Sequence, residues 1–250
     1  MNVVIEHSKS MYWFKNFSLS GRTSKLHRSF RILYSVTALM LVIFVSTNCN
    51  SFEQGSYNCL AYQPENNNAV SVKVSLSNSA IYVMEGDKPL LVTATCVGKQ
   101  DTPTPIGAFR AFNKMPRKRS NTYGFHIGGD GIRPGKRIDT PSKSKYVGYP
   151  MPCWVEFKTG YGFHTGYVHP VPRTHGCLRI HKNVAPKFFA LVNEGTPIEI
   201  AESFPEDQTI GKKIRRPKDY KDPDPKNSYM VTEKYFEDLE LKGSLFEGNS

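Results

Sequence analysis

The stretch VSVKVSLSNSAIYVMEGDKPLLVTATCV, residues 70–97, decides the fold class. Apolar residues occupy every second position from Val70 to Leu76, which is the period of a strand with one buried face. Two apolar runs follow at residues 80–84 and 89–97, separated by the turn sequence EGD. The stretch therefore predicts a strand followed by a β-hairpin.

The rest of the chain repeats this pattern in shorter pieces. Residues 123–127, 153–157 and 197–200 are further strand candidates. Apolar residues spaced three and four apart over residues 185–192 predict one helix, with Asn183 as its capping residue. We therefore expect a mainly β fold with one or two short helices.

The first 50 residues predict export. Six lysines and arginines, against Glu6 alone, precede or lead into an uncharged apolar run at residues 32–45. This run is short for a membrane span and suits the apolar part of a signal segment. It ends just before Cys49, whose setting resembles a lipoprotein cleavage site. We therefore expect a signal or anchor segment, with Cys49 as candidate lipid acceptor and residues after 50 outside the membrane.

Two further segments have the composition of connecting chain. Residues 51–68 are polar and predict a linker. Residues 202–250 mix charges of both signs with prolines and few apolar residues, which predicts an extended or weakly ordered tail. Deletion of residues 205–250 is accordingly expected to leave activity largely intact.

The chemistry-bearing residues concentrate in FHTGYVHPVPRTHGCLR, residues 163–179. A nucleophilic cysteine needs its thiolate form, which nearby imidazole and guanidinium groups favour. Cys177 has His175 and Arg179 close in sequence, and His164 lies a short loop away. Gly176 lacks a side chain, so the backbone beside Cys177 can approach a substrate carbonyl.

These residues resemble a known family. THGCLR, residues 174–179, is similar to the Ser/Thr-His-Gly-Cys signature of the L,D-transpeptidase (YkuD-like) catalytic domain. Four more stretches resemble family elements in the family's order. They are the opening hairpin at residues 70–84, GKQDTPTPIGAF at residues 98–109, YPMPCW at residues 149–154, and GTPIEI at residues 195–200 as the closing strand. The resemblance thus spans about residues 69–201, which we take as an L,D-transpeptidase-type β-sandwich domain.

The resemblance implies roles for individual residues. Cys177 would be the acyl acceptor and His164 the general acid and base. His175 and Thr174 would shape the site, Arg179 would bind or orient substrate, and Thr165 is a candidate partner of the imidazole. The N–H groups of Gly176 and Cys177 would form the oxyanion hole. No cofactor or metal is implied.

The implied reaction is acyl transfer on peptidoglycan stem peptides in the cell envelope. Cys177 would attack the bond between a diamino acid and a terminal D-alanine, and an incoming amine would resolve the thioester as a crosslink. Carbapenems are compounds that this family's thiol commonly attacks. With water as acceptor the enzyme would be an L,D-carboxypeptidase, and with a protein amine it would attach protein to peptidoglycan.

Other classes of function remain open at this point. His164, His169, His175 and Cys177 suffice in number for a zinc module, although their spacing is not a usual ligand pattern. An inactive wall-binding domain is a third possibility. The net charge of +11 alone would suit nucleic acid, but export argues against that partner.

Several remaining residues are expected to have no functional role. Cys59, Cys96 and Cys153 are expected to be structural, and their pairing cannot be deduced from sequence. The basic run at residues 117–119 is typical of a solvated loop, and His181 is expected at the surface.

Overall fold

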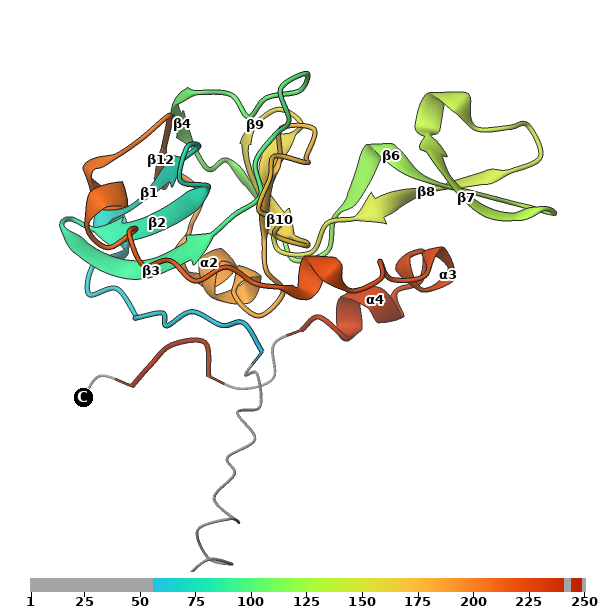
Figure 1. Cartoon of the computed structure of the whole chain (residues 1–250). Coiled ribbons are helices and arrows are strands. Elements are labelled where there is room, and N and C mark those ends of the chain that lie inside the picture. The colour runs from blue at the N-terminus through green and yellow to red at the C-terminus, as the bar shows by residue number, and fades with distance from the viewer. Residues whose placement is uncertain (1–55, 241–243, 249–250) are drawn as a thin grey trace, which may run out of the picture. The chain divides into compact units, whose positions relative to one another are not determined.

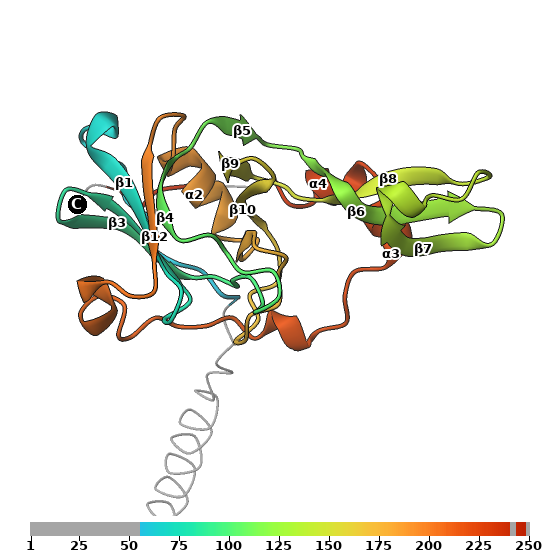
Figure 2. The same cartoon turned by 90° about the horizontal axis from the view of Figure 1, so that it is seen from above.

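The structure, a computed structural model, describes residues 56–240 and 244–248 of the 250-residue chain. In this part of the chain the strands form three sheets, accompanied by short helices (Figures 1 and 2). The expected signal or anchor segment and Cys49 lie outside the described residues. Within the described ranges, none of the helices has both the length and the apolar character that a membrane crossing requires.

The alternating stretch from residue 70 builds the first sheet, which has the strand order β3-β2-β1-β12-β4. Val72 and Val74 of β1 are buried, as the alternation predicts, and the hairpin between β2 and β3 turns at Gly86, whose φ of 58° suits glycine. The first and last strands of the domain, β1 and β12, pair in parallel. The strands are β1 (Val70–Ser75), β2 (Ala80–Glu85), β3 (Lys88–Ala94), β4 (Gly107–Arg110) and β12 (Pro197–Ala201).

The second sheet has the order β11-β10-β9-β5, with β10 and β11 parallel. Buried residues on one face of each of the two sheets form one core, into which the helix α2 (Ala185–Leu191) also packs. The rings of Phe163 in β10 and Phe188 in α2 lie 4.6 Å apart. The strands are β5 (Asn113–Met115), β9 (Trp154–Lys158), β10 (Tyr161–Thr165) and β11 (Leu178–Ile180). The predicted mainly β fold is confirmed.

The third sheet, β7-β6-β8, forms an arm beside the other two sheets (Figures 1 and 2). We call residues 119–150 the arm. Its pairing is interrupted on β6, because the register shifts between Arg119 and Gly124 where β6 pairs with β8. Residues 120–123 therefore leave the β6–β8 ladder, and we call them the bulge. The elements are β6 (Arg119–Gly128), β7 (Gly131–Lys136), η2 (Arg137–Asp139) and β8 (Lys145–Pro150).

The segment after β12 differs from the weakly ordered tail expected from its composition. Its few apolar residues are clustered, and Met230, Tyr235 and Phe236 are buried. Met230 and Tyr235 pack with Phe125 and Tyr149 of the arm, along which α3 and α4 lie (Figure 1). Composition averaged over the segment hides this local cluster. The elements are η3 (Pro205–Gln208), η4 (Asp219–Lys221), α3 (Asn227–Met230) and α4 (Lys234–Glu237).

The described part of the expected linker is also attached to the domain. Residues 67–69 form a short 3-10 helix, η1 (Asn67–Ala69). Before it, Tyr57 is buried and its hydroxyl lies 3.1 Å from that of Thr93. Asn183 does not cap α2; its side-chain amide donates to the Tyr57 carbonyl at 3.0 Å. His181 is buried rather than exposed, and its Nε2 contacts Asp219 of η4 at 3.1 Å.

Candidate active site

Two neighbouring parallel strands bring Cys177 and His164 to one pocket. His164 in β10 is the register partner of Arg179 in β11, and Cys177 immediately precedes β11. Side chains two residues apart on an extended chain point to the same face, so Cys177 and Arg179 share the face that carries His164. The intervening residues Phe163 and Leu178 are buried in the core.

This face lines a pocket of about 490 Å³. Of the residues predicted for the site, Cys177, His164, Thr174, His175 and Arg179 line it. Its other walls come from the arm, from β9 and from the turn that follows β9. These residues are Lys118, Ser120, Asn121, Thr122, Tyr123, Tyr149, Met151, Trp154, Glu156, Thr159 and Gly160.

His164 is fixed in one tautomer and held neutral. Its Nδ1–H donates to the carbonyl of Thr165 at 2.8 Å, because a carbonyl can only accept. The other ring nitrogen, Nε2, is then the one free to take a proton. Burial, aided by the positive charge of Arg179, lowers the pKa of His164 to about 4. The expected polar partner at Thr165 is thus its backbone carbonyl, not its hydroxyl.

Cys177 is half-buried, and its burial raises the pKa of the thiol. The Gly162 N–H and the positive charge of Arg179 oppose that rise. The thiol donates to the carbonyl of Gly160 at 3.7 Å, and within the described residues it makes no hydrogen bond to His164. The resting pair is therefore a neutral thiol beside a neutral imidazole.

Thr174 holds the loop that carries Cys177. Its hydroxyl donates to the Cys177 carbonyl at 2.6 Å and accepts the Gly176 N–H at 3.1 Å. Gly176 has a φ of 102°, and a Cβ at this position would meet the ring of Tyr161 at 2.5 Å. The Gly176 N–H was expected in the oxyanion hole, but here it is occupied by Thr174. The Cys177 N–H, in contrast, has no hydrogen-bond partner in the described part of the chain.

His175 and Arg179 lie on either side of Cys177 in sequence and differ in their surroundings. His175 is exposed, and its ring stacks on Tyr123 of the bulge with centroids 4.4 Å apart and planes 8° apart. Partial burial lowers the pKa of His175. Arg179 is the positive group closest in sequence to the Cys177 thiol, and its charge favours both the thiolate and the neutral form of His164.

Comparison with known proteins identifies the family of the domain. The sequence model of the YkuD family, described as the L,D-transpeptidase catalytic domain, matches residues 69–200, which is more than half of the chain. The chain belongs to the L,D-transpeptidase catalytic domain family.

Solved structures of L,D-transpeptidases are similar to the chain at low identity. The enzyme from Stackebrandtia nassauensis is 20% identical, with 63% of each chain covered and a TM-score of 0.41. The enzyme from Mycobacterium smegmatis is 19% identical, covers 53% of this chain and 58% of its own, and has a TM-score of 0.41. L,D-transpeptidase 1 from Mycobacterium tuberculosis is 23% identical, with 53% and 61% covered and a TM-score of 0.37.

The chain spans about three fifths of the length of these solved proteins. A search of curated protein sequences found no match.

In this L,D-transpeptidase-family domain, several residues that line the pocket are not predicted by the sequence analysis. Glu156 organises the wall opposite the arm, because its carboxylate accepts from the Gly160 N–H, the Asn113 amide and the Trp154 indole at 2.9, 3.0 and 3.2 Å. These bonds place the Gly160 carbonyl, which contacts the Cys177 thiol. The alternating pattern of residues 153–157 puts Trp154 and Glu156 on the same face of a strand. The sequence could therefore have predicted that these two side chains lie together.

The described residues do not form the alternative metal module. Within residues 56–240 and 244–248, no three histidine, cysteine, aspartate or glutamate side chains are grouped so that they could hold a metal ion. The described cysteines Cys59, Cys96, Cys153 and Cys177 are all free. Burial raises the pKa of Cys153 to about 11, so this thiol is unreactive near neutral pH.

Proposed function

We propose that the protein is a peptidoglycan L,D-transpeptidase that forms crosslinks through a thioester on Cys177. The main observation in support of this proposal is the register of β10 and β11, because it puts Cys177, His164 and Arg179 on one face that lines one pocket. Family membership supports the reaction class. The fixed tautomer of His164 supports its role as the group that moves the proton.

In the first half-reaction, the Cys177 sulfur attacks the carbonyl carbon of the diamino acid in a stem tetrapeptide. The thiol proton passes to Nε2 of His164, and the Cys177 N–H is the donor available to the developing oxyanion. The carbon–nitrogen bond to the terminal D-alanine then breaks. His164 returns the proton to the leaving amine, and a thioester remains on Cys177.

In the second half-reaction, the amine of another stem peptide attacks the thioester carbonyl. His164 takes a proton from this amine, and the new amide forms as the carbon–sulfur bond breaks. The sulfur recovers its proton from His164, so the enzyme returns to its starting state. The basic groups Arg179 and Lys118 at the pocket suit the carboxylates of stem peptides.

The acceptor and the location are parts of the same proposal. Water in place of the amine would give L,D-carboxypeptidase activity, and a protein amine would give attachment of protein to peptidoglycan. The expected export segment places the site in the cell envelope, with membrane attachment through that segment or through lipid on Cys49. Mass spectrometry of the products from defined tetrapeptide fragments separates crosslinked dimer from tripeptide.

The nucleophile is tested with imipenem, a carbapenem. We expect the intact protein to gain the mass of one imipenem, because acylation opens the lactam ring without a leaving group. Cys177→Ala should abolish the adduct, whereas Cys59→Ala, which removes another free thiol, should keep it. An adduct that persists in Cys177→Ala would place the nucleophile elsewhere.

A further inference from the structure

We call residues 174–177, which include Cys177, the catalytic loop. The bulge forms much of the pocket wall that faces this loop. All four of its residues line the pocket: Ser120, Asn121, Thr122 and Tyr123. The bulge is internally bonded, since the Ser120 hydroxyl accepts the N–H groups of Thr122 and Tyr123 at 3.2 and 3.1 Å. Tyr123 in turn stacks on His175 of the catalytic loop. Any shift of the bulge therefore changes the shape of the pocket.

Arg119 lies at the base of the bulge, where β6 rejoins β8 as the register partner of Pro150. Its Nη1 donates to the carbonyl of Gly148 in β8 at 3.2 Å. Gly148 in turn packs so closely against the Ser120 backbone that a Cβ there would collide with the Ser120 carbonyl. Arg119 thus ties the start of the bulge to the strand that passes beneath it.

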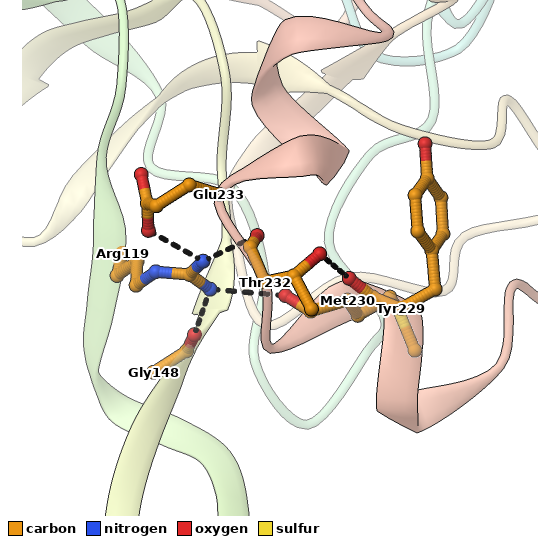
Figure 3. Close-up of polar contacts among 6 residues, drawn as sticks. All are labelled: Arg119, Gly148, Tyr229, Met230, Thr232 and Glu233. Atoms are coloured by element: carbon orange, nitrogen blue, oxygen red, sulfur yellow. Dashed lines mark hydrogen bonds and ion pairs between the residues drawn. The ribbon is translucent and has the colours of Figure 1, made fainter.

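The same guanidinium also binds the C-terminal segment (Figure 3). We call residues 227–240 the brace. Nη1 donates to the Met230 carbonyl at 3.0 Å, and Nη2 donates to the Thr232 carbonyl at 2.9 Å and to the Glu233 carboxylate at 3.1 Å. Its carbon Cζ lies 4.8 Å from the centre of the Phe236 ring.

These contacts use what is particular to arginine. Carbonyls at the end of a short helix such as α3 lack partners within the helix, and a planar guanidinium can satisfy several acceptors at once. Arg119 is only 22% exposed, so its contacts are better protected than those of a surface ion pair. Lysine has one charged nitrogen and cannot reach this set of acceptors in the same geometry.

We propose that Arg119 is a positioning residue that couples the brace to the bulge and so sets the shape in which the pocket accepts the donor peptide. The brace is then a part of the active-site architecture, although it follows the catalytic domain in sequence. Substrate readouts of this coupling rest on the proposed function, whereas the position of the bulge can be measured without any substrate.

The test compares full-length wild-type protein with Arg119→Gln, Arg119→Lys and Arg133→Gln. Arg133 is the matched control, because it lies on the same arm and, among the residues that the structure describes, forms an ion pair only with Asp130 at the surface. Hydrogen exchange followed by mass spectrometry should show amide exchange faster by about tenfold or more over residues 120–125 and 146–150 in Arg119→Gln. Exchange in β1, β10 and α2 should be unchanged. Arg119→Lys should be intermediate, and Arg133→Gln should match wild type.

Two kinetic measurements separate positioning from general stability. With a defined tetrapeptide, kcat/KM of Arg119→Gln should fall about tenfold or more, mainly through KM, because the pocket wall is displaced. The rate at which iodoacetamide alkylates Cys177 should be no lower in Arg119→Gln than in wild type, because this small reagent does not depend on contacts with the pocket wall.

Unchanged exchange over the bulge in Arg119→Gln would overturn the proposal. So would faster exchange throughout the domain together with a parallel fall in turnover and alkylation, since that is the pattern of general destabilisation. If wild-type protein turns over no stem peptide, the proposed function fails, while exchange and alkylation still decide the role of Arg119.

Discussion

At the scale of single residues, the proposed mechanism depends on the protonation of His164, which would activate the Cys177 thiol. Burial holds the imidazole neutral, and burial also keeps the sulfur as a thiol. The site therefore starts without a thiolate–imidazolium pair, and the proton must move as the sulfur attacks. Bound substrate, which excludes water and offers an oxyanion to the Cys177 N–H, assists this transfer.

The pH dependence of acylation follows from the same residue. His164 accepts a proton only in its neutral form, and a pKa of about 4 keeps it neutral throughout the range above that value. We therefore expect the acid limb of kcat/KM, or of the imipenem acylation rate, near pH 4 and not near the ordinary histidine pKa of about 6.5. Rates measured between about pH 3.5 and 8 check this.

His175 supplies the control for this measurement, because it lies beside Cys177 but is exposed. His175→Gln should keep the acid limb in place. A wild-type limb near pH 6.5 would show that His164 is not held neutral in the free protein.

At the scale of elements, buried hydroxyls hold the loop between β10 and β11: Thr104 donates to the Gly176 carbonyl at 3.0 Å, and Thr174 makes two bonds within the loop. Thr174 is buried, and its hydroxyl bridges the Cys177 carbonyl and the Gly176 N–H. Thr174→Val keeps the shape but leaves both groups without this partner. We expect it to lower the free energy of unfolding by about 1–3 kcal/mol and to slow acylation, because the Cys177 backbone is released.

Thr174→Ser retains the hydroxyl and should stay close to wild type in both respects. Chemical denaturation and the imipenem acylation rate provide the measurements. Equal behaviour of the valine and serine variants would assign the role of Thr174 to packing instead of hydrogen bonding.

Helices and strands with a longer local sequence pattern are easier to predict than those with a short one. The strand from Val70 and the hairpin after it have a clear two-residue period, and both were predicted. The strand β11, with the three residues from Leu178 to Ile180, is too short for any period to be detected. The bulge depends on pairing between β6 and β8, more than twenty residues apart, and no local signal encodes that register.

At the scale of the whole chain, the folded unit is larger than the segment that matches the family. Tyr57 is buried before that segment, and Met230 and Phe236 are buried after it. His181 also contacts Asp219 across this boundary. The sequence-based expectation that deletion of residues 205–250 leaves activity largely intact therefore conflicts with the packing.

A fragment of residues 69–201 tests this directly against residues 56–248. We expect the short fragment to lose about 3 kcal/mol or more of unfolding free energy, because buried aromatic surface is exposed and buried polar groups lose partners. Chemical denaturation of both fragments, followed by tryptophan fluorescence, gives the difference. Equal unfolding free energies of the two fragments would mean that the flanking segments lie on the domain without stabilising it.

The candidate site was predicted unevenly for the same reason. Cys177 and His164 come from a compact motif in which residue type and spacing carry the chemistry, so sequence alone pointed to them. Arg119 lies in a basic run typical of solvated loop. Arg117 of the same run pairs with the exposed carboxylate of Glu240, whereas Arg119 binds main-chain carbonyls of the brace. Tertiary contacts between distant segments carry information that local composition does not contain.

The bulge also has a consequence for how substrate preference can change in this protein. Its four residues lie outside the β6–β8 ladder, while His164 stands on β10 and Cys177 immediately precedes β11. Insertions or exchanges at residues 120–123 can therefore remodel one side of the cavity and leave the acyl-transfer chemistry intact. Under the proposed function, a library of variants confined to this segment is a direct route to proteins that accept different stem peptides.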